Sequence, residues 1–325
     1  MKRALFVLLA LVLVLSVAPL VIPVPPLEGT VPSEELADAD SLFIDVNGLR
    51  MHYKLKGHGD TTLLLLHGFA ASTFSWQAVM PQLSEMATVI AFDRPAFGLT
   101  ERPMPGEWEG ESPYSLEAQA DQTAALMDRL GIDQAVLVGH SAGGTVALLT
   151  ALRHPDRVKA VVLVDAAVYS GGTPGWLRPV LRTAQMRRLG PWMVRSLGKT
   201  GGRLLPGAWH DESKVTAEVL EGYQKPLRAD NWDRALWELV MASRPQHLEE
   251  RLGEVQVRVL VMTGEYDRIV PPEQSIRLAE ELPNAELVII PLCGHLPQEE
   301  RPEAFVAAVS TFLSGGDESI LDRED

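Results

Sequence analysis

A Gly-x-Ser-x-Gly motif at Gly139 to Gly143 constrains the fold more than any other part of the chain. An apolar run at 136–138 predicts a strand that ends at Gly139, and the small residues after Ser141 are compatible with a helix. At such a sharp strand-to-helix turn the serine adopts a strained conformation, and the glycines on both sides leave room for neighbouring backbone. We therefore expect Ser141 Oγ to project over one edge of a sheet, beside the free N–H of Ala142 at the helix N-terminus.

Strand-like apolar runs alternate with helical patterns along most of the chain, which predicts an α/β fold with a mostly parallel sheet covered by helices on both faces. The Asn47-Gly48 pair favours a type I′ turn and predicts an opening β-hairpin. The expected strands are 41–46, 49–55, 63–66, 88–92, 136–138, 161–164, 257–262 and 286–290. The expected helices are 72–85, 115–130, 142–153, 272–282 and 303–313.

Residues 170–249 interrupt this alternation, because no run there has the pattern of a buried strand. We expect an inserted helical cap. The cap contains five tryptophans and several methionines, among them Trp176, Trp192, Trp209, Trp232, Trp237, Met186, Met193 and Met241. These side chains either form a packing layer against the core or give a substrate pocket an apolar lining, and the second interpretation favours small or medium hydrophobic substrates.

The length of 325 residues suits one large α/β domain with such an insertion. The expected divisions are an N-terminal segment 1–24, a linker 25–40, the first part of the core 41–169, the cap 170–249, the second part of the core 250–314, and an acidic tail 315–325. We expect the tail to be disordered because its acidic residues have few apolar partners.

The N-terminal segment has the composition of an export signal or a membrane anchor. Lys2 and Arg3 precede an apolar run from Ala4 to Ala18, which continues beyond Pro19 to Ile22. Residues 16–18 offer a small-x-small cleavage pattern, but Pro19 would follow the cut and hinder a peptidase. We therefore favour an uncleaved anchor, with the folded body on the outer side of a membrane, over a cleaved signal that leaves an exported protein.

The charge and the cysteine content of the chain limit the kinds of partner and metal site that we expect. Its 43 acidic and 29 basic residues give a net charge of -14, which argues against binding nucleic acid. The single cysteine, Cys293, excludes an intrachain disulfide and a thiolate-cluster metal site. No phosphate-cradling glycine loop or metal-ligand spacing occurs, so we expect neither a cofactor nor a metal ion.

A serine nucleophile requires a histidine base, because the hydroxyl group is a poor nucleophile at neutral pH. Of the eight histidines, His295 lies in a loop just after the last expected strand, at the sheet edge where Ser141 also emerges. The other seven fall in the opening hairpin, at a helix end, in the cap, or directly beside other motif positions. His295 is therefore the candidate base.

The acid that orients this histidine should lie between Ser141 and His295 in the chain. Asp267, after the strand 257–262, is the first candidate; Asp165, after the strand 161–164, is its rival, and Glu265 is weaker. An oxyanion hole also needs two fixed dipoles about 3 Å from the developing charge. We expect the backbone N–H groups of Phe69 and Ala142 to supply them.

Five motifs together make this chain similar to the α/β-hydrolase fold superfamily. They are His67-Gly68-Phe69, Asp93-Arg94-Pro95-Ala96-Phe97-Gly98, Gly139-His140-Ser141-Ala142-Gly143-Gly144, Gly264-Glu265-Tyr266-Asp267 and Gly294-His295-Leu296-Pro297. The resemblance runs from about Leu42 to Leu313 and includes the order serine, acid, histidine. We expect the pair Asp93 and Arg94 to form a structural ion pair.

The resemblance is to the serine-nucleophile esterases and the C–C bond hydrolases of meta-cleavage products. Haloalkane dehalogenases and epoxide hydrolases carry aspartate at the nucleophile position, so Ser141 argues against both, whereas peroxidase-like members with the same triad stay open. The resemblance implies a serine hydrolase that cleaves carboxylic esters of small to medium size without a metal, a carboxylesterase rather than a lipase. The alternatives are a C–C bond hydrolase and a receptor-like member that binds a ligand with negligible turnover.

Overall fold

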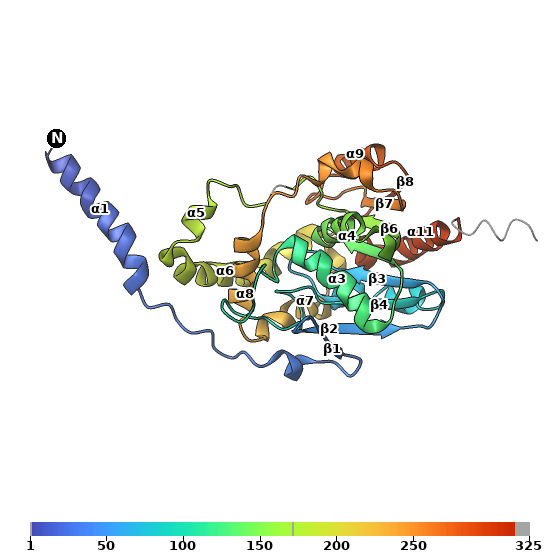
Figure 1. Ribbon diagram of the computed structural model, residues 1–325, viewed down its shortest axis with the longest axis horizontal. Helices are drawn as coiled ribbons and strands as arrows, with labels where there is room; N and C mark the ends of the chain where they lie inside the picture. Colours follow the sequence, from blue (N-terminus) through green and yellow to red (C-terminus); the bar gives the residue numbers. More distant parts are fainter. Residues whose placement is uncertain (1, 171, 316–325) are drawn as a thin grey trace, which may run out of the picture.

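One sheet of eight strands organises the protein, in the order β1-β2-β4-β3-β5-β6-β7-β8 (Figure 1). The computed structural model describes residues 2–170 and 172–315. The strands are β1 (Leu42–Val46), β2 (Leu49–Lys56), β3 (Thr62–Leu66), β4 (Thr88–Phe92), β5 (Ala135–His140), β6 (Val158–Val164), β7 (Arg258–Gly264) and β8 (Ala285–Ile290). β1 and β2 pair antiparallel, β2 also runs antiparallel to β4, and the strands from β4 to β8 are parallel.

The central strands are buried on both faces, which explains their continuous apolar runs. In β3, Leu64 and Leu66 belong to one hydrophobic cluster, while Leu63 and Leu65 belong to the other. This alternation follows from the two-residue period of a strand. The fold class expected from the sequence, an α/β-hydrolase fold, is confirmed.

Helices pack against the sheet in both hydrophobic clusters. The first cluster includes side chains of α3 (Leu116–Leu130), α4 (Ala142–Arg153) and α9 (Pro272–Glu281). The second includes side chains of α2 (Met80–Leu83) and α11 (Pro302–Ser314). α3 begins at the predicted cap residue Ser115, whose hydroxyl accepts from the Ala118 N–H, and ends at Gly131 in the left-handed conformation. The one-turn helix α10 (Pro297–Glu300) was not anticipated.

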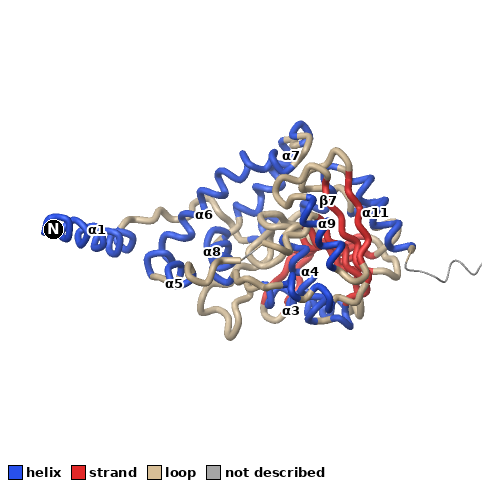
Figure 2. Tube along the Cα trace, turned by 90° about the horizontal axis from the view of Figure 1, so that it is seen from above, coloured by secondary structure: helices blue, strands red, loops and turns tan. Residues whose placement is uncertain are grey.

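The described residues between β6 and β7 form helices and no named strand. Gly171 in this segment lies outside the described residues. Its helices are α5 (Arg178–Leu181), α6 (Ala184–Leu204), α7 (Ala217–Gln224) and α8 (Trp232–Ala242), which we call the cap. Figure 2 shows α5, α6 and α8 on the side of the sheet opposite α11, and α7 at the top of the view. The cap therefore stands at one end of the sheet, with loops between it and the strands.

The N-terminal segment forms a helix, α1 (Lys2–Val21), that projects from the body and leads into an extended linker (Figure 1). The expected membrane anchor is wrong, because within 2–170 and 172–315 no helix combines the length and apolarity needed to cross a bilayer. The end of α1 instead has polar contacts with the cap: Gln185 Nε2 donates to Ser16 O at 2.8 Å, and Arg188 Nη2 donates to Ile22 O at 3.2 Å. The expected location on the outer side of a membrane depended on this anchor and is therefore also wrong.

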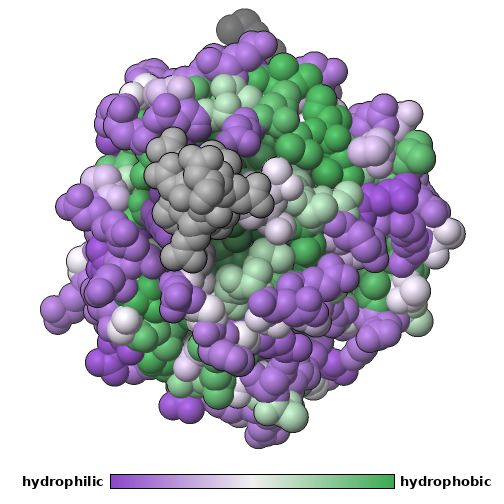
Figure 3. Space-filling view, turned by 90° about the vertical axis from the view of Figure 1, so that its right-hand side faces the viewer, coloured by the Kyte–Doolittle hydropathy of each residue, from purple (hydrophilic) through white to green (hydrophobic). Residues whose placement is uncertain are grey.

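The opposite end of the molecule carries α11. Figure 3 views this end and shows hydrophilic residues around smaller hydrophobic areas. Most of the expected acidic tail, from residue 316 onward, lies outside the described residues.

Candidate active site

The turn between β5 and α4 places Ser141 as the motif predicts. Its backbone has φ 50° and ψ -120°, a conformation that side-chain-bearing residues rarely adopt. Gly143 is required there, because a Cβ atom at this position would lie 2.2 Å from the Leu66 carbonyl oxygen. Ser141 is 8% exposed, so the residue is buried at the turn between β5 and α4.

His295 and Asp267 lie together at the same edge. His295 Nδ1 is 2.7 Å from Asp267 Oδ2, and both residues are buried. The other carboxylate oxygen, Asp267 Oδ1, accepts the N–H groups of Ile269 at 2.7 Å and Val270 at 3.0 Å. These two bonds hold the carboxylate in one orientation, and the bond to Nδ1 leaves Nε2 of His295 as the nitrogen available for proton transfer.

The rival acid, Asp165, has other partners. Its Oδ1 accepts from Thr263 Oγ1 at 2.8 Å and from the Gly264 N–H at 3.1 Å. Full burial, and then the neighbouring Asp267 carboxylate, raise the pKa of Asp165 well above its usual range. This shift favours the uncharged form of Asp165, and Asp267 is the acid whose oxygen faces the imidazole.

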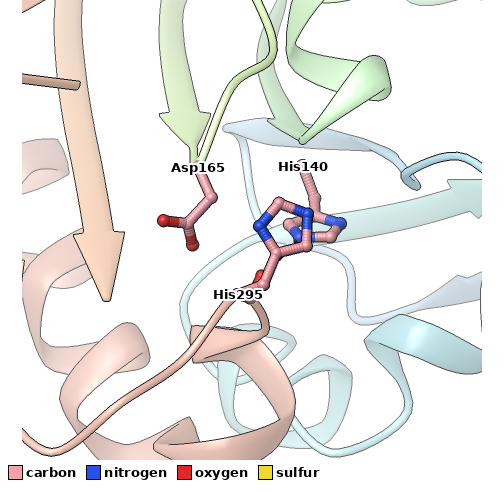
Figure 4. A group of neighbouring side chains, drawn as sticks. All are labelled: His140, Asp165 and His295. Atoms are coloured by element: carbon pink, nitrogen blue, oxygen red, sulfur yellow. Dashed lines mark hydrogen bonds between the residues drawn. The ribbon is translucent and has the colours of Figure 1, made fainter. Parts of the chain in front are cut away.

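His140 packs against His295 and comes from the end of β5, directly before Ser141 (Figure 4). The two rings have centroids 4.7 Å apart, and His140 Nε2 lies 2.7 Å from the His295 carbonyl oxygen. Because a carbonyl only accepts, Nε2 of His140 carries the proton. Burial, with the adjacent His295, holds the pKa of His140 well below its usual range, so this ring is neutral. His140 thus connects the serine turn to the histidine loop.

Figure 4 also shows Asp165 beside the two histidines, and the three residues place one nitrogen or oxygen each within 4.8 Å of one another. Such a group resembles a metal site. One nitrogen of each ring is used in a hydrogen bond inside the site, because His140 Nε2 donates to a carbonyl and His295 Nδ1 faces Asp267. Among the described residues a second such group, His247 with Glu249 and Glu250, is exposed.

The backbone N–H groups of Phe69 and Ala142 are the two expected oxyanion donors. Among the described residues, the N–H groups of Phe69 and Ala142 donate to no protein atom. Phe69 follows β3 in the loop of His67, and its ring packs against Phe97 with centroids 5.6 Å apart. Ala142 is the first residue of α4, where intrahelical acceptors do not exist. Both residues line a cavity of about 330 Å³.

None of the cap tryptophans lines this cavity. From the cap side the cavity is lined by Leu239 and Val240 of α8 and by the loop that follows α8. Trp232 and Trp237 are buried in a separate hydrophobic cluster, Trp209 lies in another, and Trp176 and Trp192 are largely exposed. The three buried tryptophans therefore pack in hydrophobic clusters, and Trp232 and Trp237 also line a second cavity.

The expected ion pair between Asp93 and Arg94 does not form. The Asp93 carboxylate instead binds His52 Nδ1 at 2.6 Å and the N–H groups of Thr73 and Leu99, each at 2.7 Å. The Arg94 guanidinium turns the other way, toward carbonyl oxygens. Adjacent residues of an extended segment point in opposite directions, which a motif alone does not reveal.

Glu300 is a site residue that the sequence reasoning missed. Its buried carboxylate accepts three backbone N–H groups: that of Gly294 at 2.7 Å, and those of His210 and Asp211 at 3.0 and 2.8 Å. The first belongs to the histidine loop and the other two follow the α6 segment of the cap. The carboxylate therefore ties the loop that carries His295 to the cap. The acidic run after the Gly294-His295 motif was the available signal.

Comparison with known proteins agrees with this fold. Residues 61–302 match the family model described as alpha/beta hydrolase fold, and the chain belongs to that family. It is therefore a hydrolase of the α/β class.

The alignments with individual relatives cover most of this chain and most of each relative. An uncharacterized hydrolase, YugF, from Bacillus subtilis is 30% identical over 270 residues, which are 82% of this chain and 96% of that protein. A 2-hydroxymuconate semialdehyde hydrolase from Pseudomonas sp. is 30% identical over 282 residues, 84% of this chain and 94% of the relative. Among solved structures, a thermophilic esterase from Thermogutta terrifontis is 27% identical with a TM-score of 0.70, covering 85% of this chain and 99% of that chain.

Proposed function

We propose that this hydrolase cleaves carboxylic esters of small to medium hydrophobic substrates through an acyl-Ser141 intermediate. The observation that supports this most directly is the buried 2.7 Å hydrogen bond between Asp267 and His295, next to a strained serine turn. The similarity to the esterase from Thermogutta terrifontis points to the same chemistry. In this proposal Ser141, His295 and Asp267 are the nucleophile, the base and the orienting acid.

The proposed reaction begins when Ser141 Oγ attacks the ester carbonyl carbon and His295 Nε2 takes the hydroxyl proton. The carbonyl oxygen becomes an anion, and the unpaired N–H groups of Phe69 and Ala142 stabilise it. When the C–O bond to the alcohol breaks, His295 returns the proton to the leaving oxygen. Water then attacks the acyl group by the same route, which releases the acid and restores Ser141.

The cavity supports a limit on substrate size. Its volume of about 330 Å³ lies at the small end of the range of roughly 300–1,000 Å³ usual for ligand pockets. We propose that residues 170–249 act as a cap over the site, because Leu239 and Val240 of α8 line this cavity. Acyl chains longer than roughly ten carbons would then require the cap to open.

A second candidate function is C–C bond hydrolysis of a meta-cleavage product. It is favoured by the similarity to the 2-hydroxymuconate semialdehyde hydrolase over nearly the full length of that relative. Such a reaction would use the same nucleophile turn, base and acid, so the two functions differ in the substrate that the cavity accepts.

The test compares wild type, Ser141→Ala and, as a matched control, Ser243→Ala, which removes a serine that lines the cavity. We expect p-nitrophenyl butyrate to be hydrolysed by the wild type and the control, and not measurably above background by Ser141→Ala. Undiminished turnover in Ser141→Ala contradicts the mechanism. Faster turnover of a meta-cleavage product than of any ester favours the second candidate. Labelling by a fluorophosphonate without turnover of either class favours a binding role.

A further inference from the structure

The guanidinium group of Arg94 contacts the loop that carries Phe69, and among the described residues it has no anionic partner. It is 2% exposed, and it donates from Nε to His67 O at 2.9 Å and from Nη2 to Gly68 O at 3.0 Å. Its third partner is the side-chain oxygen of Gln119, at 2.7 Å from Nη1. All three acceptors are neutral, and within 2–170 and 172–315 Arg94 takes part in no ion pair.

A buried cation without an anion is costly, and this one stays charged. Burial lowers the pKa of Arg94 to about 9, still above neutral pH. Residues that keep an uncompensated charge at the edge of a cavity are candidates for a role in function. Arg94 also lines the cavity beside Phe69 and Ala142.

The Gly68 carbonyl is the acceptor that matters, because it belongs to the same peptide unit as the Phe69 N–H. No peptide bond among the described residues is cis, so the carbonyl and the N–H of this planar unit point in opposite directions. Fixing the direction of Gly68 O therefore fixes the direction of the N–H. The N–H must point away from Arg94.

A second donor reaches the same carbonyl, and Arg94 controls it as well. The backbone N–H of Arg94 donates to His67 Nε2 at 3.1 Å, so the proton of this neutral ring lies on Nδ1. Burial, with the Arg94 charge next, lowers the pKa of His67 to about 3, so the ring does not become cationic. His67 Nδ1 lies 2.8 Å from Gly68 O and donates to it.

The same peptide unit lies directly against the nucleophile. A Cβ atom on Gly68 would lie 2.7 Å from His140 Nδ1 and 3.2 Å from the Ser141 Cβ. An anion that forms on the substrate carbonyl attacked by Ser141 therefore lies within reach of the Phe69 N–H. Hydrogen bonds in a chain polarise one another, so two donors on the carbonyl make the N–H at the other end a stronger donor.

We propose that Arg94 is a positioning residue of the oxyanion hole, which orients and polarises the Gly68-Phe69 peptide through a charge-assisted hydrogen bond to the Gly68 carbonyl oxygen. This inference rests on the proposed function, since it assigns Arg94 to the anion formed during acyl transfer. Arg94 acts through the peptide and not on the substrate. Its contribution is therefore largest in the tetrahedral transition state and small for bound substrate or product.

The test uses Arg94→Met and Arg94→Lys with Arg102→Met as a matched control. Arg102 is also buried, and it donates to the Gly98 carbonyl and Ser33, away from Gly68. Removal of a direct oxyanion donor costs about 10²–10³ in kcat, so for this indirect group we expect a loss of roughly 10–100-fold in Arg94→Met. KM for p-nitrophenyl butyrate should stay close to the wild-type value, and Arg102→Met should keep kcat.

Binding of inhibitors separates positioning from general damage to the fold. Affinity for butylboronic acid, which forms a tetrahedral adduct with the serine, should fall by the same factor as kcat/KM, while inhibition by butyrate stays unchanged. Arg94→Lys keeps a charge with a different donor geometry, so it should recover part of the loss. It also serves as the test variant if thermal unfolding shows that Arg94→Met does not fold.

Two results overturn the inference. One is a kcat in the Arg94 variants equal to that of the wild type or of Arg102→Met. The other is a loss that appears in KM and butyrate inhibition while boronate affinity is retained. A wild type without ester turnover and without boronate binding overturns the proposed function as well. An active wild type, an inactive Ser141→Ala and unaffected Arg94 variants overturn only the role of Arg94.

Discussion

Replacing Asp267 by asparagine should abolish most of the activity, and the reason can be read from its hydrogen bonds. Asp267 Oδ1 accepts two backbone N–H groups, from Ile269 and Val270. An asparagine must turn its only acceptor oxygen toward those donors, which leaves its NH₂ group facing His295 Nδ1. Nδ1 must then accept, so the proton moves to Nε2, the nitrogen that has to take the proton from Ser141.

The expected loss is large because the imidazole is held in the wrong tautomer. The comparable aspartate-to-asparagine change in a serine protease lowers kcat about 10⁴-fold, or roughly 5 kcal/mol in the activation free energy. Asp165→Asn is the matched control. Burial raises the pKa of Asp165, which favours its uncharged form, and its Oδ1 accepts from Thr263 and Gly264, so an asparagine can replace it with its oxygen in the same place.

The assay is kcat for p-nitrophenyl butyrate in both variants at neutral pH, with thermal unfolding to show that each is folded. We expect Asp267→Asn to lose at least about a thousandfold more activity than Asp165→Asn. A larger loss in Asp165→Asn would transfer the role of the acid to Asp165 and refute the tautomer reasoning.

Two further predictions concern carboxyl groups that join the cap to the core. Burial raises the pKa of Glu299 to about 7 from an ordinary 4.5, while Ser75 and Tyr223 donate to its Oε1. The folded state therefore holds a proton that the unfolded state releases, so this stabilisation is full below pH 4.5 and is lost as pH rises through about 7. Glu299→Gln should remove this pH dependence of the unfolding free energy, an effect of about 3 kcal/mol, and an identical slope in both proteins contradicts it. Glu300→Gln places an NH₂ group against the N–H of Gly294 or against those of the cap. The variant should lose about 1–3 kcal/mol of unfolding free energy in chemical denaturation, and its turnover should be slower. An unchanged denaturation midpoint would show that the three hydrogen bonds of Glu300 do not stabilise the protein.

Local patterns predicted most of the fold. Buried parallel strands read as unbroken apolar runs, and β3 and β4 lie within a residue of the expected ranges. The Ser115 cap likewise marked the start of α3. The 72–85 region was less regular than expected, because it contains a short 3₁₀ turn at 73–76 and the single helical turn α2.

The positions of the candidate site residues could be predicted where chain order and sheet topology determine them. Ser141, Asp267 and His295 each follow a strand, and the carboxyl ends of parallel strands meet at one edge. What the sequence does not contain is the direction of each side chain. The partners of Asp93 and Arg94 and the place of the cap tryptophans depend on contacts between distant segments, and so does the link from Glu300 to the cap.

The apolar N-terminal run was the least reliable signal. The hydropathy of a segment does not tell which residues the segment contacts. The hydrogen bonds from polar side chains of α6 to the carbonyl oxygens of Ser16 and Ile22 are visible only in the structure. Because of these contacts, the N-terminal segment touches the cap, whereas the sequence had predicted a membrane anchor.

The central claim, acyl transfer through Ser141, is tested most directly by trapping the intermediate. Intact-protein mass spectrometry after rapid acid quench of the wild type with p-nitrophenyl butyrate should show a burst-phase species heavier by one butyryl group. Digestion should place that group on the peptide that contains Ser141, and Ser141→Ala should show no adduct. A butyryl group on any other residue, or turnover that proceeds with the same adduct in Ser141→Ala, would contradict the mechanism.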